Sequence, residues 1–272
     1  MSATNTSPVQ WTSRFAFLMA SIGFAVGLGN IWRFPYMTGE NGGAVFVLMY
    51  LLCALGIGVP ILIAELLIGR NGQHSPPNAL QQVAAQEKRS PHWHWLGGMN
   101  LLAAFLIMVV YCVIAGWVLY YLYLALTTGF VGVDSVQAEQ AFTLLLASPL
   151  TLLFWTVLGL SITGAIIYAG LQKGIERAVS VLMPLLFLLL VSLVVYNALN
   201  GGLSEALHYL FAADLGKVTP GVFLAALGQA FFSIGVAMAA MMTYGAYLPK
   251  AVSIPRSALI IVLADTTVAI LA

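Results

Sequence analysis

The residues best suited to chemistry are a carboxylate and an amide in otherwise apolar sequence. Asp265 stands within the run ALIIVLADTTVAILA, and Asn30 directly follows the glycine-rich stretch GFAVGLG (residues 23–29). A carboxylate at membrane depth costs several kcal/mol unless it is paired, protonated or bound to a cation. Asp265 therefore indicates ion binding, although a hydrogen bond to a neighbouring helix would also satisfy it.

Two apolar segments carry residues that weaken a helix at its middle. Gly23, Gly27 and Gly29 interrupt the first segment, and Ser233 with Gly235 interrupts a later one. A glycine costs a helix interior roughly 1 kcal/mol relative to alanine, and freed carbonyls in hydrocarbon are tolerated only where they line a cavity. Two interrupted spans are typical of transporter substrate sites. Taken separately, the first glycines could form a helix-packing face, and Ser233 could belong to an ordinary packed helix.

The composition assigns these segments to a lipid bilayer. Hydrophobic residues make up 61% of the 272-residue chain and charged residues 7%, whereas soluble domains are about one quarter charged. The mean hydropathy is +0.97. A net charge of +1 gives no indication of nucleic acid or of an acidic partner. Cys53 and Cys112 lie in apolar runs, which favours buried thiols over a disulfide or a metal site.

The hydropathy pattern predicts six membrane spans and the start of a seventh. We place the spans at residues 15–37, 44–69, 96–127, 142–171, 178–199, 220–248 and from 257 onward. Polar loops are expected between them, the longest at residues 71–95, 129–140 and 200–219. The predicted fold class is an all-α polytopic membrane protein, with residues 1–272 forming a single transmembrane bundle.

The basic residues predict the orientation of these spans. With a cytoplasmic N-terminus, Lys217 is the exposed outer cation and Arg33 lies at the outer end of the first span. The remaining basic residues all fall on the inner side, as the positive-inside rule requires; they are Arg14, Arg70, Lys88, Arg89, Lys173, Arg177, Lys250 and Arg256. The prediction is a multi-pass protein of the cell (inner) membrane, since its short loops are typical of bacteria.

Several other residues indicate a functional role more weakly. Glu65 lies near the end of the second span, where pairing at the helix end is the expected role. Ile107 and Tyr111 are four residues apart and share one helix face, which by itself favours packing over a ligand pocket. His92 and His94 form an HxH pair in a loop, where solvated side chains are expected more often than a metal site.

The motifs resemble one known family. GFAVGLGNIWRFPY (residues 23–36) and ENGG (residues 40–43) are similar to the first-span signature of the neurotransmitter:sodium symporters, here of the bacterial amino-acid transporter branch. Tyr50, Tyr111 and Trp117, with the runs KGIER, GQAFFS and TYGAY, extend the resemblance over nearly the whole chain.

The resemblance implies an architecture already known for this family, a leucine-transporter-like fold with discontinuous helices 1 and 6 and inverted repeats. Residues 1–200 would form the first repeat and residues 201–272 part of the second. Because the family has eleven or twelve spans, we expect this chain to be a fragment with an incomplete second repeat.

The resemblance further implies two sodium sites and gives their ligands. The first sodium would be held by the Ala25 carbonyl and by the side chains of Asn30, Ser233 and Asp265. The second would use the carbonyls of Gly23 and Val26. A chloride site would involve Tyr50, Gln229 and Ser233, but Asp265 could supply the negative charge instead, so chloride dependence stays open.

A central substrate pocket is implied as well. The substrate carboxylate would meet the amides of Leu28 and Gly29 and the hydroxyl of Tyr111. The other pocket residues carried over from the family are Ala25, Ile107, Phe232, Ser233, Gly235 and Met238. The gate above the pocket would consist of Arg33, Tyr111 and Phe232.

Gly27 indicates the class of substrate. Relatives that carry amines have aspartate at this place, which supplies the carboxylate that an amine lacks, so glycine implies an amino acid. Gly235 leaves room on the pocket floor, from which we expect hydrophobic or aromatic amino acids. The resulting hypothesis is a sodium-coupled symporter, because the substrate carboxylate and Asn30 would share one ion.

Two other classes remain as alternatives. A non-transporting or channel-like membrane component would show no saturation and no sodium dependence. A membrane-embedded enzyme using Glu65 or Asp265 is disfavoured, because the sequence contains no HExxH, GxSxG or Walker A motif. The sequence does not indicate the oligomeric state, the stoichiometry or the identity of the amino acid.

Overall fold

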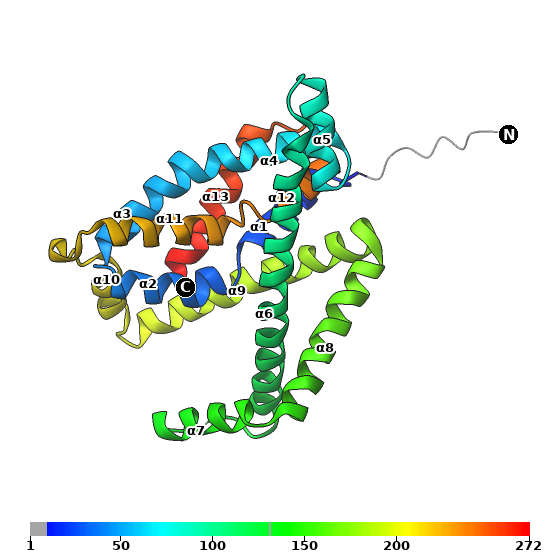
Figure 1. The fold of residues 1–272 in the computed structure, drawn as a ribbon. Coiled ribbons are helices and arrows are strands. Elements are labelled where there is room, and N and C mark those ends of the chain that lie inside the picture. Colours follow the sequence, from blue (N-terminus) through cyan, green and yellow to red (C-terminus); the bar gives the residue numbers. More distant parts are fainter. Residues whose placement is uncertain (1–9, 131) are drawn as a thin grey trace. The chain divides into compact units, whose positions relative to one another are not determined.

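The computed structural model describes residues 10–130 and 132–272 of the chain, and Figure 1 shows them as helices joined by loops. Within these residues no β-strand forms; one isolated bridge joins Gly43 to Ala213. The chain divides into two compact units, one of residues 10–101 with 171–272 and one of residues 102–170.

The larger unit begins with a helix that is broken and then resumes. Its N-terminal elements are α1 (Arg14–Ala25), the π-helical turn η1 (Gly29–Arg33), α2 (Phe34–Glu40), α3 (Ala44–Cys53), the π-helical turn η2 (Ala54–Gly58), α4 (Val59–Gly72), α5 (Pro76–Gln86), the 3-10 turn η3 (Pro91–Trp93) and the start of α6 (His94–Thr127). The η2 turn continues α3 into α4, so that these three elements make one span, Ala44–Gly72.

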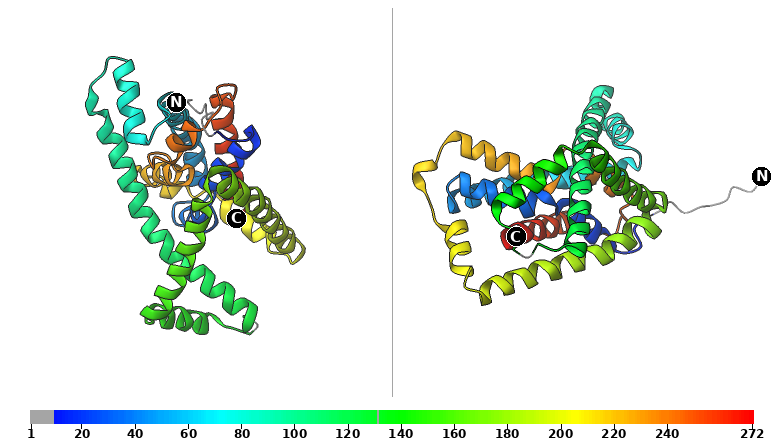
Figure 2. Two further views of the ribbon diagram at one scale, coloured as in Figure 1. Left: turned by 90° about the vertical axis from the view of Figure 1, so that its right-hand side faces the viewer. Right: turned by 90° about the horizontal axis from the view of Figure 1, so that it is seen from below.

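The C-terminal elements of the same unit surround this first group. They are the π-helical turn η4 (Leu171–Glu176), α9 (Arg177–Leu199), α10 (Leu203–Phe211), the 3-10 turn η5 (Leu215–Lys217), α11 (Pro220–Ile234), α12 (Ala240–Ala246) and α13 (Ile254–Leu271). Helix α11 packs along α3, α12 along α4, and α1 lies between α13 and α9. Figure 2 shows the same elements from two further sides.

The second unit is a small antiparallel assembly. It contains the rest of α6, then α7 (Ser135–Leu146) and α8 (Pro149–Tyr168). Gly116 of α6 lies so close to Thr156 of α8 that a Cβ atom there would be 2.8 Å from the Thr156 amide nitrogen. Trp117 and Phe142 meet edge to face with ring centroids 5.2 Å apart. The absence of a side chain at Gly116 thus permits the close contact between α6 and α8, and the pair of aromatic rings joins α6 to α7.

Local sequence explains where the helices begin. Proline occupies the first turn of α5, α8, α11 and α13, where its missing N–H costs nothing because that donor has no partner inside the helix. Ser13 accepts a hydrogen bond from the Ala16 amide at the start of α1, and Thr219 caps α11 in the same way. Asp134 and Gln137 form a capping box at the start of α7.

Six of the seven predicted spans match a candidate span of the described residues, whereas the predicted span at residues 220–248 is divided into the shorter helices α11 and α12. Among the described residues, five helices are long and apolar enough to cross a membrane, and α1 with η1 and α2, bent by 49°, is a sixth candidate span. The predicted fourth span is wrong at its start, because α7 ends at Leu146 and α8 begins at Pro149. The predicted loops at residues 71–95, 129–140 and 200–219 contain α5, the start of α7 and α10.

Candidate functional site

The first span is interrupted at its glycines, as predicted. Helix α1 ends at Ala25 because Val26 takes an extended conformation, with φ −73° and ψ 116°. Helical geometry resumes with η1 at Gly29. Asn30 closes the break, since its side-chain oxygen accepts a hydrogen bond from the Gly27 amide at 3.0 Å. The break therefore places a buried amide side chain beside peptide groups that lie outside a regular helix.

The sixth predicted span is interrupted as well. Helix α11 ends at Ile234, and Gly235 takes the left-handed conformation with φ +72°. A Cβ atom at Gly235 would lie 2.3 Å from the Phe24 ring, so both the backbone and this contact require glycine. Ala237 and Ala239 also have φ of +62°, an uncommon conformation for residues with a Cβ, before α12 begins at Ala240.

Three predicted sodium ligands meet where the two breaks face α13. The Asn30 Nδ2 donates to Asp265 Oδ1 at 2.7 Å, to the Asp265 carbonyl at 3.0 Å and to Ser233 Oγ at 3.1 Å. Ser233 Oγ in turn donates to Asp265 Oδ2 at 2.7 Å. Asn30 and Asp265 are 0% exposed and Ser233 is 1% exposed. Although Asn30 and Ser233 are 203 positions apart in the sequence, the three residues form one buried polar cluster.

Among the residues that the structure describes, no basic side chain forms a hydrogen bond or ion pair with this cluster. Asp265 receives hydrogen bonds from Asn30, Ser233 and Tyr50, the last at 3.3 Å from the hydroxyl to Oδ2. All three donors are neutral. A buried carboxylate held by neutral donors alone keeps a strong attraction for a cation, because leaving a charge unpaired in a low-dielectric interior is costly.

A second polar group lies beside the cluster. Gln229 Nε2 donates to the Gly29 carbonyl at 2.8 Å, and Gln229 Oε1 accepts from Arg33 Nη1 at 2.8 Å. The Arg33 guanidinium lies over the Phe232 ring, 5.0 Å from its centroid. Of the predicted chloride ligands, Gln229 is thus engaged with Gly29 and Arg33, whereas Tyr50 and Ser233 are engaged with the carboxylate of α13.

Glu65 does not have the role that its position in the sequence suggested. It is 5% exposed, and its Oε1 accepts a hydrogen bond from the Ala237 amide at 2.6 Å. The expectation of helix-end pairing is therefore wrong: Glu65 holds the unwound segment between α11 and α12. The signal for this role was weak, because nothing in the sequence links Glu65 to a residue 172 positions away.

Residues 10–12, which we call the N-terminal strap, tie two helices together at the start of α1. Trp11 is 3% exposed, and it donates from Nε1 to the Tyr244 carbonyl at 3.0 Å and from its amide to the Tyr247 carbonyl at 3.2 Å. Thr12 donates to both carboxylate oxygens of Glu176, at 3.0 Å from its amide and 2.5 Å from its hydroxyl. The strap thereby joins the region of α12 to η4.

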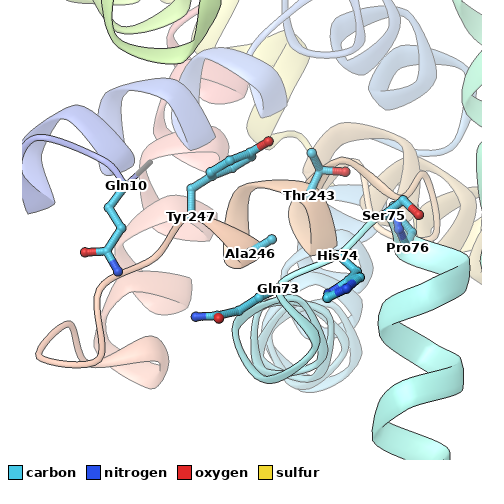
Figure 3. Close-up of a pocket in the computed structure, with 8 residues that line it drawn as sticks. All are labelled: Gln10, Gln73, His74, Ser75, Pro76, Thr243, Ala246 and Tyr247. Atoms are coloured by element: carbon cyan, nitrogen blue, oxygen red, sulfur yellow. The ribbon is translucent and has the colours of Figure 1, made fainter. Parts of the chain in front are cut away.

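A cavity of about 620 Å³ lies beside the strap (Figure 3). Its polar lining includes Gln10, Gln73, His74, Thr243 and Tyr247. None of the predicted ion or substrate residues lines it. The cavity is therefore separate from the cluster at the helix breaks.

The other residues predicted to line the substrate pocket lie on several different elements. Leu28 lies in the first break and Met238 in the second. Ile107 and Tyr111 belong to the part of α6 in the second unit, residues 102–170. That these four residues contribute to one substrate pocket stays a prediction. The carbonyl ligands of the two sodium sites, at Ala25 for the first and at Gly23 and Val26 for the second, also stay predictions.

Comparison with known proteins gives consistent matches. The chain is 38% identical to the uncharacterised sodium-dependent transporter YhdH of Bacillus subtilis, over 97% of this chain and 58% of the relative. It is 34% identical to an uncharacterised sodium-dependent transporter of Haemophilus influenzae, over 100% of this chain and 61% of that one. The crystal structure of MhsT in complex with L-phenylalanine matches with a TM-score of 0.86 at 41% identity, over 97% of this chain and 60% of MhsT.

These matches agree with the broken helices described above. The chain spans about 60% of the length of the relatives it matches. The structural match confirms the all-α, leucine-transporter-like fold with discontinuous first and sixth spans. A sequence model of the sodium:neurotransmitter symporter family matches residues 9–135 and 148–272, and the chain belongs to this family.

Proposed function

We propose that this chain carries the ion and substrate site of a sodium-coupled symporter of amino acids, with a preference for hydrophobic or aromatic side chains. The observation that carries the proposal is the buried Asp265 carboxylate at the junction of two broken helices, whose hydrogen-bond donors among the described residues are all neutral. A cation bound there supplies the missing charge. The family to which the chain belongs is one of transporters, and we propose no enzymatic activity.

The oxygens around Asn30 suit a hard cation. Its Nδ2 faces the Ser233 hydroxyl, the Asp265 carboxylate and the Asp265 carbonyl. Oxygens that converge on one positively polarised N–H group can converge equally on a cation, and carboxylate, carbonyl and hydroxyl oxygens are the ligands that hard cations prefer. Sodium binding then requires the Asn30 amide to turn its oxygen toward this point and away from the Gly27 amide.

Substrate binding follows from the same break. The amides of Leu28 and Gly29 stand at the start of a helical turn, where partial positive charge attracts a carboxylate. A substrate carboxylate and the sodium ion beside it would attract each other, so each binds more tightly when the other is present, and the coupling is reciprocal. The L-phenylalanine in the matching MhsT structure supports an amino-acid substrate with an aromatic side chain.

Gly27 provides a test of the substrate class. A Cβ atom built at this glycine meets nothing within 4 Å, so a side chain can be added without a steric clash. Gly27→Asp should abolish sodium-driven uptake of amino acids in proteoliposomes, because its carboxylate repels that of the substrate. Gly27→Asn has the same shape without the charge and serves as the matched control.

The control separates charge from fold. We expect Gly27→Asn to keep most of the uptake and Gly27→Asp to lose it at an equal amount of folded protein. Full uptake by Gly27→Asp would refute an amino-acid substrate whose carboxylate binds at this break. Flux without saturation or sodium dependence in the parent protein would instead favour the channel-like alternative.

We also propose the cell membrane as the location, with the N-terminus in the cytoplasm. The distribution of basic residues supports this orientation, since Arg14, Arg70, Lys173, Arg177 and Arg256 gather at one end of the predicted spans. A cysteine placed near the N-terminus should be labelled by an impermeant maleimide only after the cells are opened.

A further inference from the structure

A groove of about 260 Å³ runs between the first turns of α1 and the start of α9. Thr12, Ala16 and Met19 line it from the α1 side, and Gln172, Arg177 and Ser180 line it from the other. All these residues belong to the larger unit of the chain. Its walls are thus two predicted membrane spans, at the end of the bundle where the basic residues gather.

The charge available inside the groove is positive. Arg177 is exposed, and in the part of the chain that the structure describes no hydrogen bond or ion pair engages its guanidinium. Glu176 also lines the groove, but it is 7% exposed and both of its carboxylate oxygens accept hydrogen bonds from Thr12. The acidic residue is therefore already satisfied, whereas the five N–H donors of the arginine are free to bind an anion.

The groove changes from polar to apolar along α1. Thr12 lies at the polar end with Gln172, whose amide donates to the Gln10 carbonyl. Phe15, which is 62% exposed, lines the groove one turn deeper, followed by Met19. A cationic entrance above an exposed apolar wall matches a molecule with an anionic head and a hydrocarbon tail.

We propose that this groove binds an anionic phospholipid, with the phosphate at Arg177 and an acyl chain along Phe15 and Met19. Basic pockets between membrane helices are known to hold anionic lipid headgroups. The apolar wall favours a bilayer lipid over free phosphate, which would leave Phe15 in contact with water. The lipid would bridge α1 and α9 beside the strap and stabilise their contact.

The test uses the full chain in nanodiscs of phosphatidylcholine with an increasing fraction of phosphatidylglycerol. We expect the anionic lipid to raise Tm and to stay bound in native mass spectrometry. Arg177→Gln should weaken its apparent affinity about five-fold, the effect of one basic residue near an anionic surface. Lys173→Gln is the matched control, because Lys173 lies four residues before Arg177, in η4, and carries the same charge but does not line the groove.

A second variant covers the case in which Arg177→Gln fails to fold. Ser180→Phe fills the groove from α9 and keeps its charge, so it should also displace the lipid. Equal losses in Arg177→Gln and Lys173→Gln would show a general charge effect and overturn the proposal. Lipid retention by folded Ser180→Phe, or an equal rise of Tm with inorganic phosphate alone, would overturn it too.

Discussion

Replacing Asp265 by asparagine should weaken sodium binding far more than it weakens the fold. The asparagine oxygen can still accept the hydrogen bond that Asn30 gives to Oδ1. The hydroxyls of Ser233 and Tyr50, which donate to Oδ2 in the parent, can accept instead, because a hydroxyl is both donor and acceptor. The variant thus removes one charge and keeps the shape of the cluster.

The size of the effect follows from the geometry. The three oxygens around Asn30 Nδ2 lie 2.7 to 3.1 Å from it, so a cation in their midst would be within roughly 4 Å of the carboxylate charge. Such a pair is worth about 4 kcal/mol at an effective dielectric constant near 20. Since asparagine still offers an oxygen ligand and is easier to bury without an ion, we expect a loss of roughly 100-fold in sodium affinity.

The assay is the rise of Tm with sodium chloride, compared at equal ionic strength with choline chloride. Thr267→Val is the control, because Thr267 lies on the exposed side of α13 and its hydroxyl bonds only to the Leu263 carbonyl of the same helix. The control should respond to sodium as the parent does. A half-saturating sodium concentration for Asp265→Asn within about three-fold of the parent would refute the ion site.

Three further outcomes are expected. Glu65→Ala leaves the Ala237 amide without its acceptor and should cost about 1–3 kcal/mol of folding free energy, seen as a lower Tm, whereas Glu65→Gln keeps an acceptor and most of the stability. Trp11→Ala removes a buried ring and its hydrogen bond and should cost about 3–5 kcal/mol in the same measurement; an unchanged Tm would contradict the strap. Replacing chloride by gluconate should leave uptake unaltered, because the Tyr50 hydroxyl already donates to Asp265.

The helix breaks could be predicted from sequence because their causes are local. Gly235 is the residue at which α11 ends in the left-handed conformation, and Val26 stands among the glycines where α1 ends. An aspartate in an apolar run is visible in the same way. The meeting of Asn30, Ser233 and Asp265 was expected only through the resemblance to a family, since no spacing rule joins residues so far apart.

Other features could not be predicted because they depend on tertiary contacts. The carboxylate of Glu65 accepts a hydrogen bond from the Ala237 amide, 172 positions away in the sequence. The Phe24 ring lies so close to residue 235 that only glycine fits there. The start of α8 was missed because the apolar run around Ser148 conceals a helix boundary in hydropathy alone. Backbone partners of this kind leave no periodic signal in a sequence.

The strap also sets how often the start of α1 is released at equilibrium. Five hydrogen bonds hold it, two from Trp11, two from Thr12 and one from Gln172 to the Gln10 carbonyl. At a net value of about 1 kcal/mol each, simultaneous release would cost about 5 kcal/mol and leave roughly one molecule in several thousand unlatched. Because the five bonds are released together, the loss of any one of them should raise the fraction of molecules with a released strap roughly five-fold.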